Sequence, residues 1–203
     1  MMGKNRLEAF SDGVLAIIIT IMVLELKVPH GSDLDALRPL VPVFFSYVLS
    51  FVFIGIYWNN HHHLFHSFQR VTAGIMWANL HLLFWLSLFP LVTGWIGEYH
   101  SESIPTALYG VVCLMSAIAY TILQITIIRS EGSESVLARA IGSNMKGRIS
   151  LLCYALAIGA AFVEQWVSDG LYCLVALIWL VPDRRVEKAL GQADAGRGTH
   201  NRP

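Results

Sequence analysis

Polar residues that could carry chemistry lie where long apolar stretches begin or end. Arg6, Ser11 and Asp12 open the first stretch, residues 9–28. A charged side chain at the centre of a membrane span costs at least about 2.5–3.5 kcal/mol, so Asp12 requires a partner. Arg6 lies less than two helical turns away, and the two can neutralise each other directly or through another helix. We expect this pair to be a folding contact near the membrane interface, and a contact that also holds a pore helix would affect gating.

A run of histidines forms the second polar cluster. It follows Trp58 and consists of His61, His62, His63 and His66. His62 and His66 are one helical turn apart, a spacing that suits a metal, but zinc sites usually add Glu or Cys and the neighbouring sequence has neither. We therefore expect no metal. One or two of these histidines should instead hydrogen-bond the first polar cluster, and since free histidine titrates near pH ~6.5, that contact could sense pH.

The third apolar stretch carries Asn79, His81 and Ser87, whose default role is to hydrogen-bond a neighbouring helix. Pro90 should kink or loosen this helix. The chain has no Gly-rich phosphate loop, no HExxH, no G-x-S-x-G and no basic nucleic-acid patch. The sequence thus favours neither an enzyme nor a nucleic-acid-binding protein, and no cofactor is expected.

The composition identifies the class of protein that must position these residues. Hydrophobic residues make up 55% of the 203 residues and charged residues only 14%, against about 25% charged in soluble domains. The apolar residues form long blocks, so this is an integral membrane protein. Three cysteines without paired spacing argue against disulfides or zinc. No cleavage site follows the first apolar run, which we expect to be retained.

A spanning helix needs about 20 mainly apolar residues. The predicted fold is all-α, with a channel domain over residues 1–190 that contains six transmembrane helices at about 9–28, 39–60, 71–95, 104–128, 149–167 and 170–182. The sixth is short, and the apolar spacing of Val186, Ala189 and Leu190 favours its continuation through Asp183–Leu190. Residues 191–203 look like a disordered tail.

Positive charge orients the helices. With the N-terminus in the cytoplasm, the outside segments hold only Lys27 and Arg38, whereas the inside segments hold twelve basic residues: Lys4, Arg6, Arg70, Arg129, Arg139, Lys146, Arg148, Arg184, Arg185, Lys188, Arg197 and Arg202. Both termini are therefore expected in the cytoplasm. The outside segments are acidic, which could concentrate cations at an entrance or simply keep the surface solvated.

One face of the first helix is a candidate pore lining. Ile17, Ile21 and Leu24 share a face at i, i+4 and i+7, and Thr20 lies beside them. A ring of such side chains blocks ions when it is narrow, because it dewets, and should be only modestly selective when wide. The residues alone leave three alternatives: a channel, a small proton- or ion-coupled transporter that uses Asp12 and the histidines, and a membrane enzyme or assembly factor.

The motifs resemble those of one known family, the transmembrane protein 175 potassium channels, over nearly the whole chain. The first helix is similar to its RxxxFSD signature through Arg6, Phe10, Ser11 and Asp12. Its WxxHH element is matched by Trp58, His61 and His62. Its third-helix pattern is matched by Asn79, Ser87, Pro90 and Thr93, and its C-terminal ending by residues 180–185. His63, His81 and Glu25 depart from the pattern.

The resemblance implies a homotetramer in the cell (inner) membrane that conducts potassium and other monovalent cations. It implies that four copies of the first helix line the pore. Ile17, Ile21 and Leu24 match the constriction, and Thr20 matches a position that offers a hydroxyl to the ion. It also implies a polar network that anchors this helix, made of Arg6, Phe10, Ser11, Asp12, Trp58, His61, His62 and Asn79.

Overall fold

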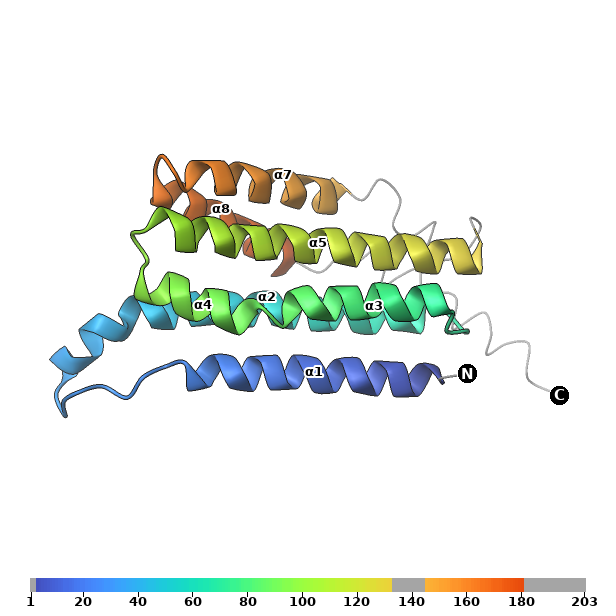
Figure 1. The fold of residues 1–203 in the computed structure, drawn as a ribbon, viewed down its shortest axis with the longest axis horizontal. Coiled ribbons are helices and arrows are strands. Elements are labelled where there is room, and N and C mark those ends of the chain that lie inside the picture. The colour runs from blue at the N-terminus through green and yellow to red at the C-terminus, as the bar shows by residue number, and fades with distance from the viewer. Residues whose placement is uncertain (1–2, 133–144, 181–203) are drawn as a thin grey trace.

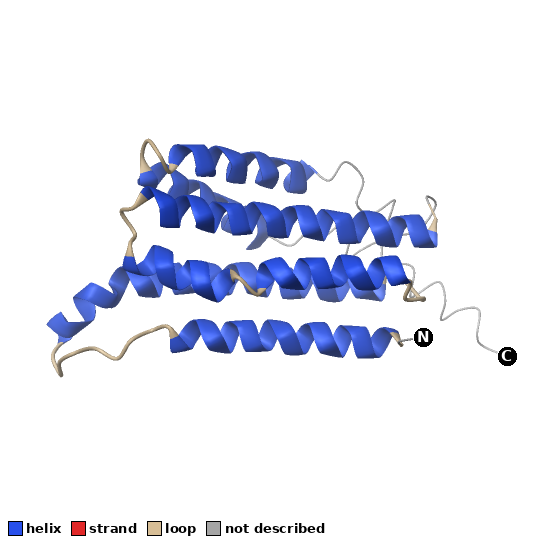
Figure 2. Cartoon of the chain, viewed as in Figure 1, coloured by secondary structure: helices blue, strands red, loops and turns tan. Residues whose placement is uncertain are grey.

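A computed structural model describes residues 3–132 and 145–180, and in these ranges every regular element is a helix (Figure 2). The elements are α1 (Lys4–Leu24), the short 3₁₀ helix η1 (Leu34–Leu40), α2 (Val41–His66), α3 (Ala73–Leu86), α4 (Phe89–Glu98), α5 (Ser103–Glu131), α7 (Met145–Ala160) and α8 (Gln165–Leu180). The predicted continuation through residues 183–190 and the tail 191–203 lie outside the described residues.

The helices run along a common axis (Figure 1). α1 packs on α2, α3 and α4, while α7 and α8 pack on α5 and α8 also contacts α2. Within residues 3–132 and 145–180, four segments are long and apolar enough to cross a bilayer, namely Lys4–Leu24, Leu34–His66, Ala73–Glu98 and Ser103–Glu131. The all-α, multiply spanning architecture is thus confirmed, and the count of six spans stays a prediction.

The chain connections gather at two ends of the bundle. The end marked N in Figure 1 holds residues 67–72 and the last turn of α5, and the shorter α7 begins on the same side without reaching this end. The opposite end holds residues 25–40, 99–102 and 161–164. The first group contains segments that the charge pattern assigns to the inside, and the second contains segments that it assigns to the outside. Which side faces the cytoplasm stays a prediction.

The predicted third span is interrupted three residues before its proline. α3 ends at Leu86, and α4 begins at Phe89 with Pro90 in its first turn. A proline has no N–H for the carbonyl four residues earlier, so the break falls on the preceding turn and not on the ring itself. The two halves remain in line (Figure 1) and together form one apolar segment.

The other predicted boundaries shift by several residues. α1 begins and ends earlier than 9–28, and α2 continues past residue 60 through the histidines to His66. The fifth predicted span, 149–167, contains a turn: α7 ends at Ala160 and α8 starts at Gln165. Short-range bonds such as Val163 N to Ala160 O (2.9 Å) close that turn. The sequence contains no proline here, and Phe162 and Val163 continue the apolar run through the turn.

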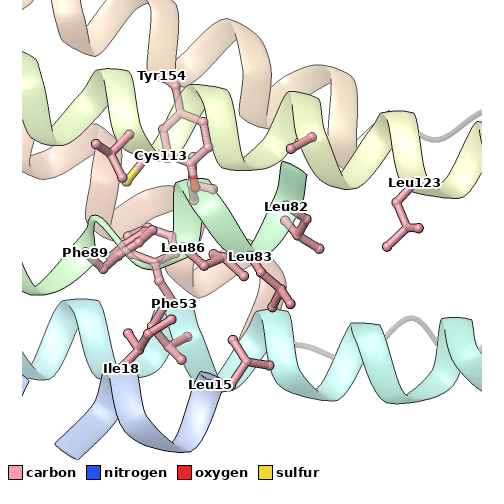
Figure 3. Close-up of a cluster of buried hydrophobic side chains, with 14 of the residues drawn as sticks. Leu15, Ile18, Phe53, Leu82, Leu83, Leu86, Phe89, Cys113, Leu123 and Tyr154 are labelled. Carbon is pink, nitrogen blue, oxygen red and sulfur yellow. The ribbon is translucent and has the colours of Figure 1, made fainter. Parts of the chain in front are cut away.

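The core that holds α1 lies between α1, α2 and the α3–α4 pair. Leu15 and Ile18 of α1 point toward Phe53 of α2 and toward Leu83 and Phe89 (Figure 3). The Phe53 and Phe89 rings are 6.3 Å apart, centroid to centroid, and tilted. Inside a bilayer such packing, and not escape from water, stabilises helix association. One face of α1 is therefore fixed by close contact within the subunit.

Candidate functional site

The side chains of α1 divide into three faces. The buried face consists of Leu7, Ser11, Leu15, Ile18 and Met22, which repeat at i, i+4, i+8, i+11 and i+15. A second face carries Glu8 and Asp12 and contacts α2. The third face, called the free face below, is not covered by any other helix in the described part of the chain. The whole helix is apolar enough to span a membrane, so the free face must meet lipid or another chain.

The free face holds the four residues predicted to line a pore. Ile17, Ile21 and Leu24 are 58%, 42% and 79% exposed, and Thr20 is exposed beside them. With Phe10 they span about a third of the helix circumference. The predicted sharing of one face is therefore present in the structure, on the side of α1 that no other described helix covers.

Thr20 is the hydroxyl on this face. Its Oγ1 donates a hydrogen bond to the Ile17 carbonyl oxygen at 2.9 Å. The proton is thus directed back into the helix, which leaves the oxygen lone pairs on the exposed side. An oxygen in that state can only accept, and it presents a partial negative charge to a cation.

A buried hydrogen-bond chain joins α1 to α3 and α2. Asn79 Nδ2 donates to Ser11 Oγ at 2.9 Å, and Ser11 Oγ donates to the Leu7 carbonyl oxygen at 2.9 Å. His61 Nε2 lies 2.8 Å from Asn79 Oδ1. All three polar side chains are at most 1% exposed. α1, α2 and α3 thus each contribute one residue to the chain. The hydrogen bonds fix the positions of the three helices relative to one another along the bundle axis.

The geometry at His61 determines its tautomer. The Asn79 amide nitrogen is directed at Ser11, so its carbonyl oxygen Oδ1 faces His61; that oxygen can only accept, and His61 Nε2 therefore carries the proton. His61 Nδ1 is buried and finds no hydrogen-bond partner in the described part of the chain. The ring stacks on Phe65 at 4.0 Å between centroids. A neutral ring suits this site, since a second buried N–H would be unsatisfied.

Two further contacts join α1 to α2, which runs antiparallel to it (Figure 1). Trp58 Nε1 donates to Asp12 Oδ1 at 3.1 Å. One turn nearer the N-terminus of α1, and one turn further along α2, Glu8 Oε1 lies 3.4 Å from His62 Nδ1. The premise that no carboxylate lies near the histidines is therefore wrong: the antiparallel register brings Glu8 to them.

Two predicted network members lie elsewhere. Arg6 is exposed and forms no ion pair with Asp12 in residues 3–132 or 145–180, because it lies on the free face of α1. Phe10 is 51% exposed, also on the free side. Asp12 is instead satisfied by the Trp58 indole. Of the eight residues expected in the network, these two stand outside it.

A second polar cluster was not anticipated from the sequence. Thr93 Oγ1 donates to Ser50 Oγ at 2.7 Å, and Ser50 Oγ lies 3.0 Å from Tyr109 Oη. All three are buried. Thr93 Oγ1 also lies 3.9 Å from Met22 Sδ. The cluster therefore joins α4, α2 and α5 beside α1, and a Ser within the apolar run of α2 was the available signal.

Comparison with known proteins gives a consistent assignment. Residues 6–90 match the sequence model of the family described as endosomal/lysosomal potassium channel TMEM175. A Chryseobacterium protein named a potassium channel is 59% identical over 93% of this chain and 98% of its own length. A Streptomyces collinus protein, also named a potassium channel, is 33% identical over 88% and 92% of the two chains.

A solved structure extends the similarity to three dimensions. It is the crystal structure of a lysosomal potassium-selective channel TMEM175 homolog from Chamaesiphon minutus. The fold agrees with a TM-score of 0.77 at 28% identity, over 88% of this chain and 96% of the other. Sequence motifs, fold and close relatives therefore coincide, and this chain belongs to the TMEM175 family.

Proposed function

We propose that this chain is the subunit of a potassium-permeable cation channel, a homotetramer in the cell membrane whose pore is lined by the free face of α1. The observation that carries the proposal is the arrangement of α1 itself. One face is locked into the subunit by Ser11 and its apolar neighbours, while Ile17, Ile21 and Leu24 project from the subunit. Relatives named as potassium channels support the choice of ion.

Four such faces around one axis would make a constriction of aliphatic rings. A narrow ring of Ile and Leu excludes water, so it acts as a gate without any moving plug. The Thr20 hydroxyl oxygens, one per subunit, would form a ring of acceptors next to it. Because such a ring supplies few of the oxygens that a dehydrated ion needs, we expect modest preference for potassium over sodium.

The polar contacts of α1 give the gate a rigid support. Ser11 and Asn79 hold the helix from inside the subunit, and Asp12 and Trp58 hold it against α2. Widening of the constriction then requires α1 to move together with its neighbours, or these bonds to break. The two ends of the bundle also differ in charge, and acidic residues such as Glu25 and Glu102 would attract cations toward one mouth.

The reversal potential under a potassium/sodium gradient tests this proposal. The purified wild-type chain in planar bilayers should show a reversal potential displaced toward the potassium equilibrium value. Ile17→Asn introduces an amide at the constriction and should change the permeability ratio. Val23→Asn is the matched control, because Val23 is a 44% exposed aliphatic residue of α1 off the free stripe. An unchanged ratio in Ile17→Asn would remove Ile17 from the filter.

The same recordings separate a channel from a transporter that uses Asp12 and the histidines. Alternating access moves ions one cycle at a time, whereas a pore passes them in resolvable unitary currents. Wild-type protein should give unitary steps. Flux that is detectable only in vesicle populations, with no unitary step, would favour the transporter.

A further inference from the structure

Three side chains with metal-binding atoms converge where the N-terminal part of α1 meets the last turn of α2. They are Glu8 of α1 and His62 and His66 of α2, and their ligand atoms all lie within 4.8 Å of one another. His62 Nδ1 and Glu8 Oε1 are 3.4 Å apart. The His62 and His66 rings are 4.5 Å apart between centroids. The potassium pathway proposed above uses none of these groups.

The spacing is close to what a tetrahedral ion requires. Zinc binds nitrogen and carboxylate oxygen at about 2.0–2.2 Å, which separates neighbouring ligand atoms by about 3.4 Å in a tetrahedron. The His62–Glu8 pair already has this separation. His66 is exposed on the last turn of α2, so a rotation of its side chain can bring its ring nitrogen inward. A fourth position would remain for water.

The donor set and its surroundings narrow the choice of ion. Two imidazole nitrogens and one carboxylate suit zinc or nickel better than magnesium or calcium, which prefer oxygen. The His62 side chain is 45% exposed, so an ion can enter from water. Asp12, one turn away on α1, adds negative charge, and the Trp58 ring stacks beside His62 at 6.4 Å. Another titratable side chain, His63, lies beside the site, with its ring 5.9 Å from the His62 ring between centroids.

We propose that Glu8, His62 and His66 form a divalent metal site of zinc type that clamps the start of α1 to the end of α2. The ion would add a third link to the Asp12–Trp58 and Glu8–His62 contacts at this end of the helix pair. The proposal rests on the geometry of two helices within one subunit. It holds or fails independently of whether α1 lines a pore.

Zinc binding by the purified chain, prepared without a polyhistidine tag, is the first test. Isothermal titration with zinc chloride should give one ion per subunit. Glu8→Gln and His66→Gln should each weaken binding at least about tenfold. His63→Gln and Glu25→Gln make the same chemical changes outside the group, and both should bind as wild type does.

Cobalt(II) gives a signal that a misfolded variant cannot imitate. In His66→Cys a thiolate replaces the imidazole at a similar reach, so an ion held jointly with Glu8 and His62 should show a near-ultraviolet thiolate-to-cobalt charge-transfer band. The band should be absent in wild type and should vanish when Glu8→Gln is added. Wild-type protein that binds no zinc, His63→Gln that loses as much affinity as His66→Gln, or His66→Cys without the band would each overturn the site.

Discussion

Replacement of Asn79 by leucine would test the anchor that holds α1 in the subunit. Leucine has the same branching as asparagine and a somewhat larger volume, so the change removes two hydrogen bonds and leaves no cavity. Ser11 Oγ loses its donor and the His61 N–H loses its acceptor, both at sites at most 1% exposed. Side-chain hydrogen bonds between membrane helices contribute about 0.6 kcal/mol on average and up to about 1.7 kcal/mol each.

Two such bonds give an expected loss of about 1–3 kcal/mol in the free energy of unfolding. A loss in the lower half of that range, about 1–2 kcal/mol, changes the folded-to-unfolded ratio roughly 5- to 30-fold. Unfolding by SDS in mixed micelles, followed by tryptophan fluorescence, measures it. Ser11→Ala should cost less, and the double variant should cost less than the two single changes together, because both remove the same bond.

Asn60→Leu is the matched control for this experiment. The Asn60 amide donates to the Ile56 carbonyl oxygen of its own helix at 2.9 Å, so its loss leaves no other helix unpaired. We expect a change within about 0.5 kcal/mol, as for substitutions away from packed sites. If Asn79→Leu unfolds at the same SDS concentration as Asn60→Leu, the Ser11–Asn79–His61 chain does not anchor α1.

Two further predictions concern the α4 end of the bundle. Gly97→Ala should destabilise the fold by about 1–3 kcal/mol, because a Cβ there would lie 2.7 Å from Ser46 Oγ and 2.9 Å from the Val43 backbone. The control is Gly55→Ala, where no atom lies within 4 Å of the added carbon. It should be neutral or stabilising in the same SDS titration. The hydrogen bond and charge of Glu98 raise the pKa of Lys27, so Glu98→Gln should lower that pKa in an NMR titration of the lysine. The contribution of this exposed pair to the melting temperature should be complete below pH ~10.4, where unfolded lysine titrates, and should fade above it; a Lys27 pKa that does not change in Glu98→Gln would contradict the pairing.

The sequence predicts the helical class and the sharing of faces well, because both depend on periodicity within one helix. Ile17, Ile21 and Leu24 are an example: their spacing alone puts them on one side of α1. The Ser11–Asn79 contact was expected only through family resemblance, since hydropathy does not say which polar groups of two spans meet. The structure contains this Ser11–Asn79 hydrogen bond.

The contacts that were missed depend on how helices lie beside one another. Glu8 and His62 are 54 positions apart, and only the antiparallel register of α1 and α2 brings them to 3.4 Å. Arg6 precedes Glu8 by two residues and therefore points to a different face, so its proximity to Asp12 in sequence was misleading. The turn after Ala160 escaped detection because Ala161, Phe162 and Val163 continue the apolar run through it, and backbone hydrogen bonds such as Val163 N to Ala160 O close it.

The central claim is that the free face of α1 meets its symmetry copies around a pore, and cadmium block of cysteine variants tests it most directly. Cys113, Cys153 and Cys173 would first be replaced by serine to give a silent background. Ile21→Cys would then place one thiol per subunit on the free face, and four converging thiols should bind cadmium and block the potassium current. Val23→Cys, exposed on α1 but off that face, should conduct unblocked. Equal sensitivity of the two variants, or block of Val23→Cys alone, would contradict the claim.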